Sequence, residues 1–239
     1  MFYQSNKELV ESLKERKVLK TPEIIKAFLR IDRKDFVPQE FLNEAYNDYP
    51  LPIGREQTIS QPYTVAFMLE LLEPKQEQKI LDVGFGSGWT TCLLAEITRT
   101  NTNYNSNREP TRIEDDKVRT SSRDGSQEFA SGKVYAIEIA PEVFEFGKRN
   151  IEKYNFLKKG IVEIFLGDGS KGLPEKAPFD RILISAAAKK IPQSLLDQLN
   201  DNGVLVIPAD NGIYKIKKSG DKINKEFYFG FSFVPLVGD

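Results

Sequence analysis

A glycine-rich turn directly after an apolar strand constrains the fold more than any other feature of this sequence. Residues 79–83 read Lys-Ile-Leu-Asp-Val and run into Gly84, Gly86 and Gly88. Closely spaced glycines let the backbone bend sharply and approach a ligand without clashes from Cβ atoms. Residues 90–97 then have the pattern of a helix whose amino end faces the same point. The segment therefore predicts a strand–turn–helix unit of an α/β fold, with a ligand at the turn.

The spacing of the glycines and one acid before them narrow the class of ligand. A dinucleotide fingerprint reads G-x-G-x-x-G, but Trp89 occupies the place of its third glycine. Asp82 stands just before the turn, where a carboxylate would repel a pyrophosphate and suit an ammonium or sulfonium. This points to S-adenosylmethionine rather than NAD. The alternative is a turn that only connects the strand to the helix and binds no ligand.

The chain of 239 residues contains no histidine. This excludes Ser-His-Asp and Cys-His catalysis and every histidine-based metal site. Acidic residues alone could still bind a metal, but no cluster with ligand spacing supports one, so we expect no metal. Any general base must come from Asp, Glu, Lys or Tyr, or the chemistry must need little help from one.

Charge and cysteine usage predict a cytoplasmic protein. The net charge of −1 gives no basic field for nucleic acid or an anionic membrane. The polar amino terminus lacks the apolar stretch of a signal peptide, and no apolar run approaches the roughly 20 residues that cross a bilayer. Cys92 is the only cysteine, which excludes an internal disulfide and fits a small core residue in a reducing compartment.

Apolar runs alternate with stretches of helical periodicity along most of the chain. Such runs suit a mostly parallel sheet covered by helices on both faces. Prolines at 38, 50 and 52 exclude a long regular element in the turn-rich region 36–54. We expect helices at 6–17, after Thr21-Pro22, and at 62–72, 141–154 and 192–199, and strands at 80–83, 134–139, 162–166, 181–185 and 204–207. Strands at 213–217 and 226–234 predict an antiparallel pair at the end of the sheet.

Length and an apolar content of 40% suit a single domain, 1–239. Within it we expect a helical and substrate-loop region at 1–75 and a cofactor-binding core at 76–239. Residues 98–131 are polar and cannot bury enough surface to offset their ordering entropy, which predicts a flexible insertion. Because they join a helix to the next strand, they should lie opposite the ligand crevice. We interpret them as a tolerated surface insertion, with a binding tail as the alternative.

Acidic residues end two further predicted strands. Glu138 ends the strand that begins at Val134, where a carboxylate can accept hydrogen bonds from both ribose hydroxyls of a nucleoside. Asp168, followed by Gly169, ends the third strand and could accept from an adenine amino group. Together with Asp82, acids stand at three successive strand ends, which favours a nucleoside-containing ligand.

Other segments carry a more specific pattern. Residues 48–54 read Asp-Tyr-Pro-Leu-Pro-Ile-Gly, and residues 57–62 read Gln-Thr-Ile-Ser-Gln-Pro. Further matching segments are Gly-Asp-Gly at 167–169, Ala-Pro-Phe-Asp at 177–180, Ser-Ala-Ala-Ala at 185–188 with Ile191-Pro192, Leu-Asp-Gln-Leu at 196–199 and Phe-Val-Pro-Leu at 233–236. Together they resemble the signature of the protein-L-isoaspartate O-methyltransferase family, from about Leu9 to the carboxyl end apart from the insertion. The chain departs from it at Glu56, where the family usually has glycine, and at Trp89.

The resemblance implies a Rossmann-like methyltransferase fold with extra N-terminal helices. It implies S-adenosyl-L-methionine as the cofactor, with S-adenosyl-L-homocysteine as product, and isoaspartyl residues of damaged proteins and peptides as the substrate. Ser60 is the implied active-site residue, and the implied substrate-binding residues are Thr58, Ile59 and Ser60. Together with the residues argued above, the cofactor-binding set is Gln57, Thr58, Ser60, Asp82, Gly84, Gly86, Gly88, Glu138, Asp168 and Gly169.

This chemistry accounts for the missing histidine. The free α-carboxylate of an isoaspartyl residue has a pKa of roughly 3.3–3.7 and is already an anion at neutral pH, so it needs no base. The Ser60 hydroxyl can hold it near the amino end of the helix that starts at Pro62. The alternative is that Ser60 or Thr58 only caps this helix. The methyl ester would then collapse to a succinimide.

Two other functions stay open on the sequence alone. One is a carboxylate methyltransferase of the same fold that acts on another peptide substrate. The other is a cofactor-binding adaptor without catalysis, against which the intact Thr-Ile-Ser-Gln-Pro motif argues. We expect a monomer.

Overall fold

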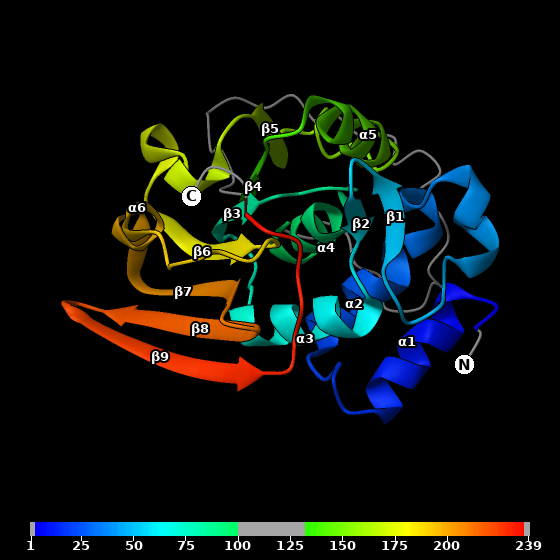
Figure 1. Cartoon of the computed structure of the whole chain (residues 1–239), viewed down its shortest axis with the longest axis horizontal. Coiled ribbons are helices and arrows are strands. Elements are labelled where there is room, and N and C mark those ends of the chain that lie inside the picture. Colours follow the sequence, from blue (N-terminus) through cyan, green and yellow to red (C-terminus); the bar gives the residue numbers. More distant parts are fainter. Residues whose placement is uncertain (1–2, 100–131, 237–239) are drawn as a thin grey trace, which may run out of the picture.

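The structure, a computed structural model, describes residues 3–99 and 132–236. A seven-stranded sheet runs through this part of the chain (Figure 1). Its strand order is β5-β4-β3-β6-β7-β8-β9. The first five of these strands run parallel, and β8 and β9 add an antiparallel pair at one edge. The strands are β3 (Lys79–Val83), β4 (Lys133–Glu138), β5 (Val162–Leu166), β6 (Phe179–Ile184), β7 (Leu199–Ala209), β8 (Gly212–Ser219) and β9 (Lys222–Phe229). The predicted α/β fold class is confirmed.

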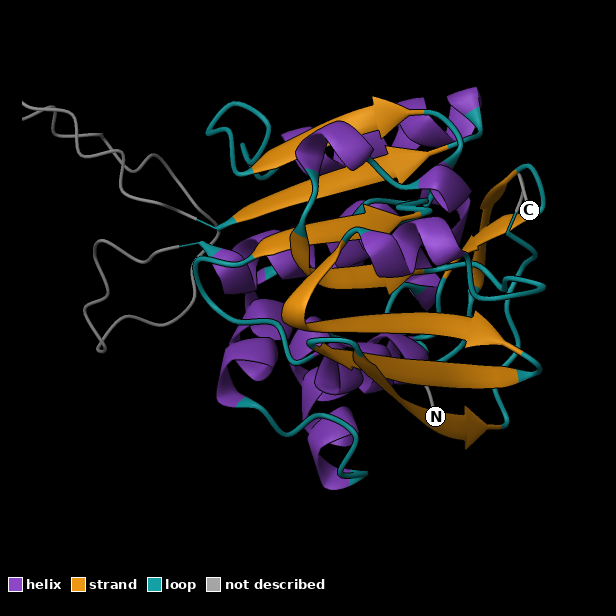
Figure 2. Cartoon of the chain, turned by 90° about the vertical axis from the view of Figure 1, so that its left-hand side faces the viewer, coloured by secondary structure: helices purple, strands orange, loops and turns teal. Residues whose placement is uncertain are grey.

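Alternate residues of each central strand enter two different apolar clusters. Ile80 of β3 packs in one cluster with the N-terminal helices, and Leu81 and Val83 pack in the other. This follows from the period of two in a strand and explains why both faces are covered, as Figure 2 shows. One face carries α1 (Asn6–Glu15), α2 (Pro22–Arg30), α3 (Pro62–Leu72), α4 (Trp89–Thr98) and α5 (Pro141–Glu152), and the other carries α6 (Gln193–Asp197). Short 3₁₀ helices lie at Arg33–Phe36, Gln39–Glu44, Gly169–Lys171 and Pro174–Lys176. None of the helices in the described residues is both long and apolar enough to span a membrane.

Two strand predictions were wrong in extent: the last strand, and the strand 204–207, which runs from Leu199 to Ala209 because Leu199 also pairs with β6 and Ala209 with β8. The predicted strand 226–234 begins earlier, at Lys222, and ends at Phe229, because Gly220 and Asp221 form a tight turn that pairs Ser219 with Lys222. The prolines were predicted to exclude a long regular element from region 36–54, and the 3₁₀ helices and the strand that lie there are indeed short. Strand β1 (Leu51–Gly54) pairs with β2 (Gln57–Ile59) in a separate two-stranded sheet, where the prolines are tolerated because the strands are short and lie at an edge.

The order of the strands reverses beside β3. From β3 the chain moves to β4 on one side, and it later returns to β6 on the other side. Such a reversal opens a crevice at the carboxyl ends of the strands, which is where open α/β sheets bind their ligands. The glycine turn after β3 lies at this point.

The predicted flexible insertion lies outside the described residues from 100 to 131, and only its flanks can be placed. Thr98 belongs to α4 and is buried, so the insertion as predicted begins too early. The Thr98 carbonyl accepts from Glu77 N at 2.9 Å, and Lys133 N donates to Gln78 O at 3.0 Å. The flanks therefore lie at the amino ends of β3 and β4, as predicted. The glycine turn lies at the opposite, carboxyl end of β3.

Candidate functional site

A cavity of about 730 Å³ lies at the carboxyl ends of β3, β4 and β6. Its volume is in the usual range for small-molecule and cofactor sites, roughly 300–1,000 Å³. Segments far apart in the sequence meet in its wall, at residues 57–61, 83–87, 137–140, 185–186 and 232–236. The cavity thus brings the predicted glycine turn and the Gln-Thr-Ile-Ser-Gln segment to one place.

The glycine turn has the sharply bent backbone that its sequence predicts. Gly84, Gly86 and Gly88 have φ values of +76°, +53° and +84°, a region that L-residues with a side chain rarely adopt. No atom lies within 4 Å of a Cβ built on Gly84, so its backbone faces open space on the cavity side. Gly88 is different, because its Cβ would lie 2.7 Å from the side chain of Ile151. Gly84 thus keeps the ligand side clear, and Gly88 allows packing against α5.

A glycine of α5 completes this packing, and sequence reasoning missed it. A Cβ on Gly147 would lie 2.3 Å from the carbonyl oxygen of Gly86 and 2.6 Å from the Phe85 ring. A glycine in the middle of an otherwise amphipathic helix is the signal that could have revealed it, because such a residue usually marks a close approach.

We expect Gly147→Ala to destabilise the protein by about 1–3 kcal/mol, the usual cost of overpacking. This outweighs the gain of up to about 1 kcal/mol in helix propensity. Thermal denaturation measures the effect, and Gly167→Ala is the matched control, since a Cβ there would meet only Ile137 at 3.7 Å. Equal melting temperatures of the two variants would contradict this account of the turn.

Glu138 lines the cavity and also holds the turns around it. One carboxylate oxygen accepts from Gly86 N at 3.1 Å, and the other accepts from Ile139 N at 2.9 Å and Ala140 N at 3.1 Å. The side chain is 7% exposed. The structure therefore brings Glu138 to the glycine turn, as the sequence predicts.

Asp82 does not line the cavity, contrary to the position expected of a residue that contacts the ligand. It is fully buried, and Thr91 of α4 donates to Asp82 Oδ2 at 2.7 Å. The other oxygen, Oδ1, has no hydrogen-bond partner among the described residues. Burial raises the pKa of Asp82 to about 7; the bond from Thr91 opposes this rise, and the charge of Glu138 adds to it. Asp82 thus connects the end of β3 to α4 through Thr91.

The raised pKa of Asp82 predicts a pH dependence of stability. Between the ordinary pKa of 3.8 and about 7, the folded state binds more protons than the unfolded state, so stability falls as pH rises through this window. We expect Asp82→Asn to remove this contribution, which is at most about 1.4 kcal/mol per pH unit. Urea denaturation of both proteins at pH 5 and pH 7 checks it. A difference between them that does not change with pH would rule out the shifted pKa.

Asp168 also lies outside the cavity wall, whereas its neighbour Gly169 lines it. Asp168 Oδ1 accepts from the backbone N–H and the hydroxyl of Ser170, at 3.0 and 2.7 Å. Desolvation acts to raise the pKa of Asp168, but the bonds from Ser170 and the charge of Lys171 outweigh it and lower the pKa. The carboxylate therefore stabilises its own turn.

Ser60 lies in the cavity wall with Gln57, Thr58 and Ile59, all on or next to β2. Ser60 is half-buried, and its hydroxyl has no hydrogen-bond partner among the residues that the structure describes. The capping interpretation of this serine was wrong. The residue that caps α3 by position is Gln61, without a side-chain bond, and Asp48 Oδ1 accepts from Tyr63 N at 2.8 Å in the first turn. The hydroxyl of Ser60 is therefore available to a ligand.

The hairpin turn beside Ser60 holds the residue that departs from the family pattern. Arg55 and Glu56 both adopt left-handed backbone conformations, with φ of 51° and 58°. Glycine adopts this conformation without strain, which is the physical reason for a glycine in place of Glu56. The side chain of Arg55 pairs with Glu142 at the start of α5, but both side chains are exposed, so this ion pair adds little stability.

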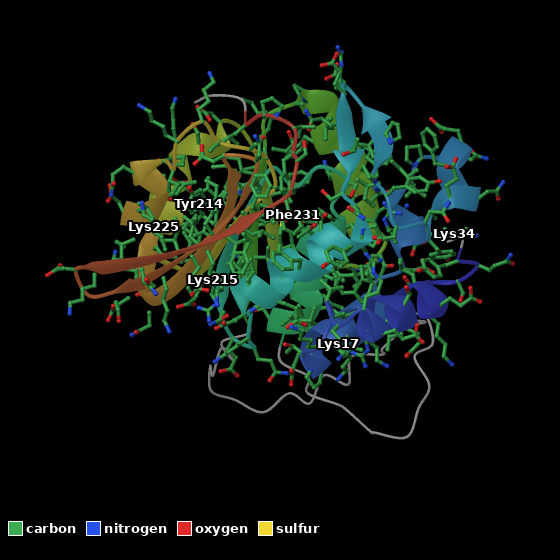
Figure 3. The ribbon with its side chains drawn as sticks, turned by 60° about the horizontal axis from the view of Figure 1, so that its bottom comes forward. Lys17, Lys34, Tyr214, Lys215, Lys225 and Phe231 are labelled. Atoms are coloured by element: carbon green, nitrogen blue, oxygen red, sulfur yellow. The ribbon has the colours of Figure 1, made fainter. Side chains whose placement is uncertain are left out.

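The last described residues, Ser232 to Leu236, close the remaining side of the cavity. Phe231 packs on Phe67 of α3 with ring centroids 4.8 Å apart, and Figure 3 shows it beside the end of β9. Further on, Ala187 N donates to Val234 O at 2.7 Å and Leu236 N donates to Ala187 O at 2.8 Å. Residues 233–236 carry a family motif but were not predicted to belong to the site, and residues 232–234 were predicted to lie in the last strand, which ends at Phe229.

Comparisons with known proteins agree with this geometry. The sequence profile of the family Protein-L-isoaspartate(D-aspartate) O-methyltransferase (PCMT) matches residues 4–130 and 127–239. A protein-L-isoaspartate O-methyltransferase of Pyrobaculum islandicum is 40% identical over 95% of this chain and 97% of its own length. One of Methanopyrus kandleri is 34% identical over 100% of this chain and 94% of its own. A crystal structure assigned to such an enzyme of Plasmodium falciparum, in complex with S-adenosyl-L-homocysteine, matches 99% of this chain and 100% of its own with a TM-score of 0.77 and 25% identity.

Proposed function

Because the chain belongs to the protein-L-isoaspartate O-methyltransferase family, we propose that it methylates the free α-carboxylate of L-isoaspartyl residues in damaged proteins and peptides. The methyl donor is S-adenosylmethionine. One observation carries the proposal: the glycine turn and the unpartnered hydroxyl of Ser60 open into the same cavity. The methyl ester can lose methanol to form a succinimide, which reopens partly as normal aspartate, so methylation begins a repair.

The residues on the cofactor side fit the proposed donor. Gly84 and Gly86 leave space for a ligand against the backbone, and Glu138 presents a carboxylate at the end of β4 for ribose hydroxyls. The donor, when bound, supplies an electrophilic methyl group on a sulfonium. Asp82, although buried below the turn, places a carboxyl group near it in sequence and space, and we propose that it acts through the turn rather than by contact.

The protein's main contribution to the reaction is alignment. The substrate carboxylate is an anion at neutral pH and is already nucleophilic. Ser60 donates a hydrogen bond to one carboxylate oxygen and directs the other toward the glycine turn, and Thr58 and Ile59 form the adjoining wall. Correct orientation of two reacting groups lowers a barrier by up to roughly 7–11 kcal/mol. No histidine is needed, because no proton has to be removed.

We further propose that the protein acts in the cytoplasm and as a single chain. The net charge of −1 supports action on proteins and peptides rather than on nucleic acid.

The test is transfer of a labelled methyl group to paired synthetic peptides. One peptide contains an L-isoaspartyl residue, and its control contains normal aspartate at the same position. We expect label in the first alone, as a base-labile ester. Label on other peptide carboxylates but not on isoaspartyl would favour the alternative carboxylate methyltransferase. Cofactor binding without any transfer would favour the adaptor.

A further inference from the structure

An arginine outside the cavity connects its two walls. Arg33, in the 3₁₀ helix Arg33–Phe36, has 0% of its surface exposed. Its Nη1 donates to Ala45 O at 2.6 Å and Asn47 O at 3.2 Å, and its Nη2 donates to Tyr49 O at 3.0 Å and Ser60 O at 3.2 Å. All four acceptors are backbone carbonyls.

The same guanidinium packs on the helix that follows the glycine turn. It lies over the ring of Trp89, the first residue of α4, at 5.5 Å from the ring centroid. Burial lowers the pKa of Arg33 to about 9, with Asp48 and Tyr49 acting in the opposite direction, so the group stays charged at neutral pH. One buried charge thus contacts Trp89 on the donor side and holds the backbone of Ser60 on the substrate side.

We propose that Arg33 is a positioning residue for methyl transfer, which fixes the backbone of Ser60 relative to the glycine turn. The proposal rests on the function proposed above. The Ser60 carbonyl is held by Arg33, so the guanidinium sets where the Ser60 hydroxyl stands. Only arginine offers several donors in one rigid plane, and lysine at this position could satisfy fewer of the four carbonyls. A shift of about 1 Å in an aligned group can lower a rate on the order of 100-fold.

The competing explanation is that Arg33 only stabilises the fold. The chain offers a matched control in Arg181 of β6, which is 6% exposed and also binds backbone carbonyls, Glu73 O at 3.0 Å and Asp180 O at 2.8 Å. Arg181 lies near the amino end of its strand and does not line the cavity. Loss of either arginine leaves buried or partly buried carbonyls without this donor, so both should lower the melting temperature.

The experiment compares Arg33→Lys, Arg33→Met and Arg181→Met with the wild type, at a temperature where each is folded. The measurements are the melting temperature, the Kd for S-adenosylhomocysteine by calorimetry, and kcat and KM for an isoaspartyl peptide. We expect Arg33→Met to lower kcat/KM by on the order of 10- to 100-fold with a nearly unchanged Kd. Arg33→Lys should recover part of the loss, and Arg181→Met should keep its kcat/KM despite a similar loss of stability. If Arg33→Met does not fold, the milder Arg33→Lys carries the comparison.

Three results would overturn the role of Arg33: wild-type kcat/KM in folded Arg33 variants, an equal loss of activity in Arg181→Met, or a loss of cofactor affinity that accounts for the whole effect. A wild-type protein that transfers no methyl group to any isoaspartyl peptide would overturn the proposed function instead. The wild-type measurement therefore separates the two failures.

Discussion

Replacing Ser60 by alanine is expected to lower methyl transfer to an isoaspartyl peptide by about 10- to 150-fold, with cofactor affinity nearly unchanged. A hydrogen bond to a charged group contributes about 1.5–3 kcal/mol, and the lost bond is to the substrate carboxylate. Steady-state kinetics with the peptide, together with calorimetric titration of S-adenosylhomocysteine, measure both quantities.

The structure makes this test cleaner than the sequence suggested. Because the Ser60 side chain makes no capping bond to α3, the free energy of unfolding of the alanine variant should lie within about 0.5 kcal/mol of that of the wild type. Ser60→Thr is the matched control, since it keeps a hydroxyl at the same position. Wild-type turnover in a folded Ser60→Ala protein would remove Ser60 from the reaction.

Replacing Glu138 by alanine is expected to weaken S-adenosylmethionine binding by about 1–3 kcal/mol. Two charge-assisted hydrogen bonds to the ribose are lost. The backbone N–H groups of Gly86, Ile139 and Ala140 also lose their acceptor, which loosens the cavity wall in the same direction. Isothermal titration with the cofactor gives the change directly.

Glu142→Ala is the control for a general effect of removing negative charge near the cavity. Glu142 follows four residues later, its side chain is 59% exposed, and it does not line the cavity. It should bind cofactor like the wild type. Unchanged affinity in Glu138→Ala would exclude Glu138 from the binding site.

The central fold was predictable because its signals are local. Pro62 and the residues before Pro74 defined α3, which runs from Pro62 to Leu72 as predicted. The apolar runs gave the parallel strands. The edge of the sheet was harder, because β9 is exposed over nearly its whole length and has no buried face to set its limits. Polar residues after the turn at Gly220-Asp221 concealed the start of the strand.

The site was predictable where family motifs or strand ends placed residues at the cavity, as for Ser60 and Glu138. The position of Asp82 could have been corrected by the alternation of the strand. It shares a face with Ile80, which packs under the N-terminal helices, and not with Val83, which reaches the cavity wall. Arg33 could not be assigned, because it acts on Ser60, 27 residues away, through a contact that only the tertiary structure creates. The position of Gly147 inside a helix indicated a close approach, but not that its partner is Gly86.

The wall formed by Ser232 to Leu236 has a consequence for how the protein is made. A ribosome exposes the chain from its amino end, so the glycine turn and Ser60 emerge long before this wall. A ligand can stabilise only a fold that binds it. The cavity wall is complete only once Ser232 to Leu236 have left the ribosome, so the methyl donor can stabilise the complete site only after that point.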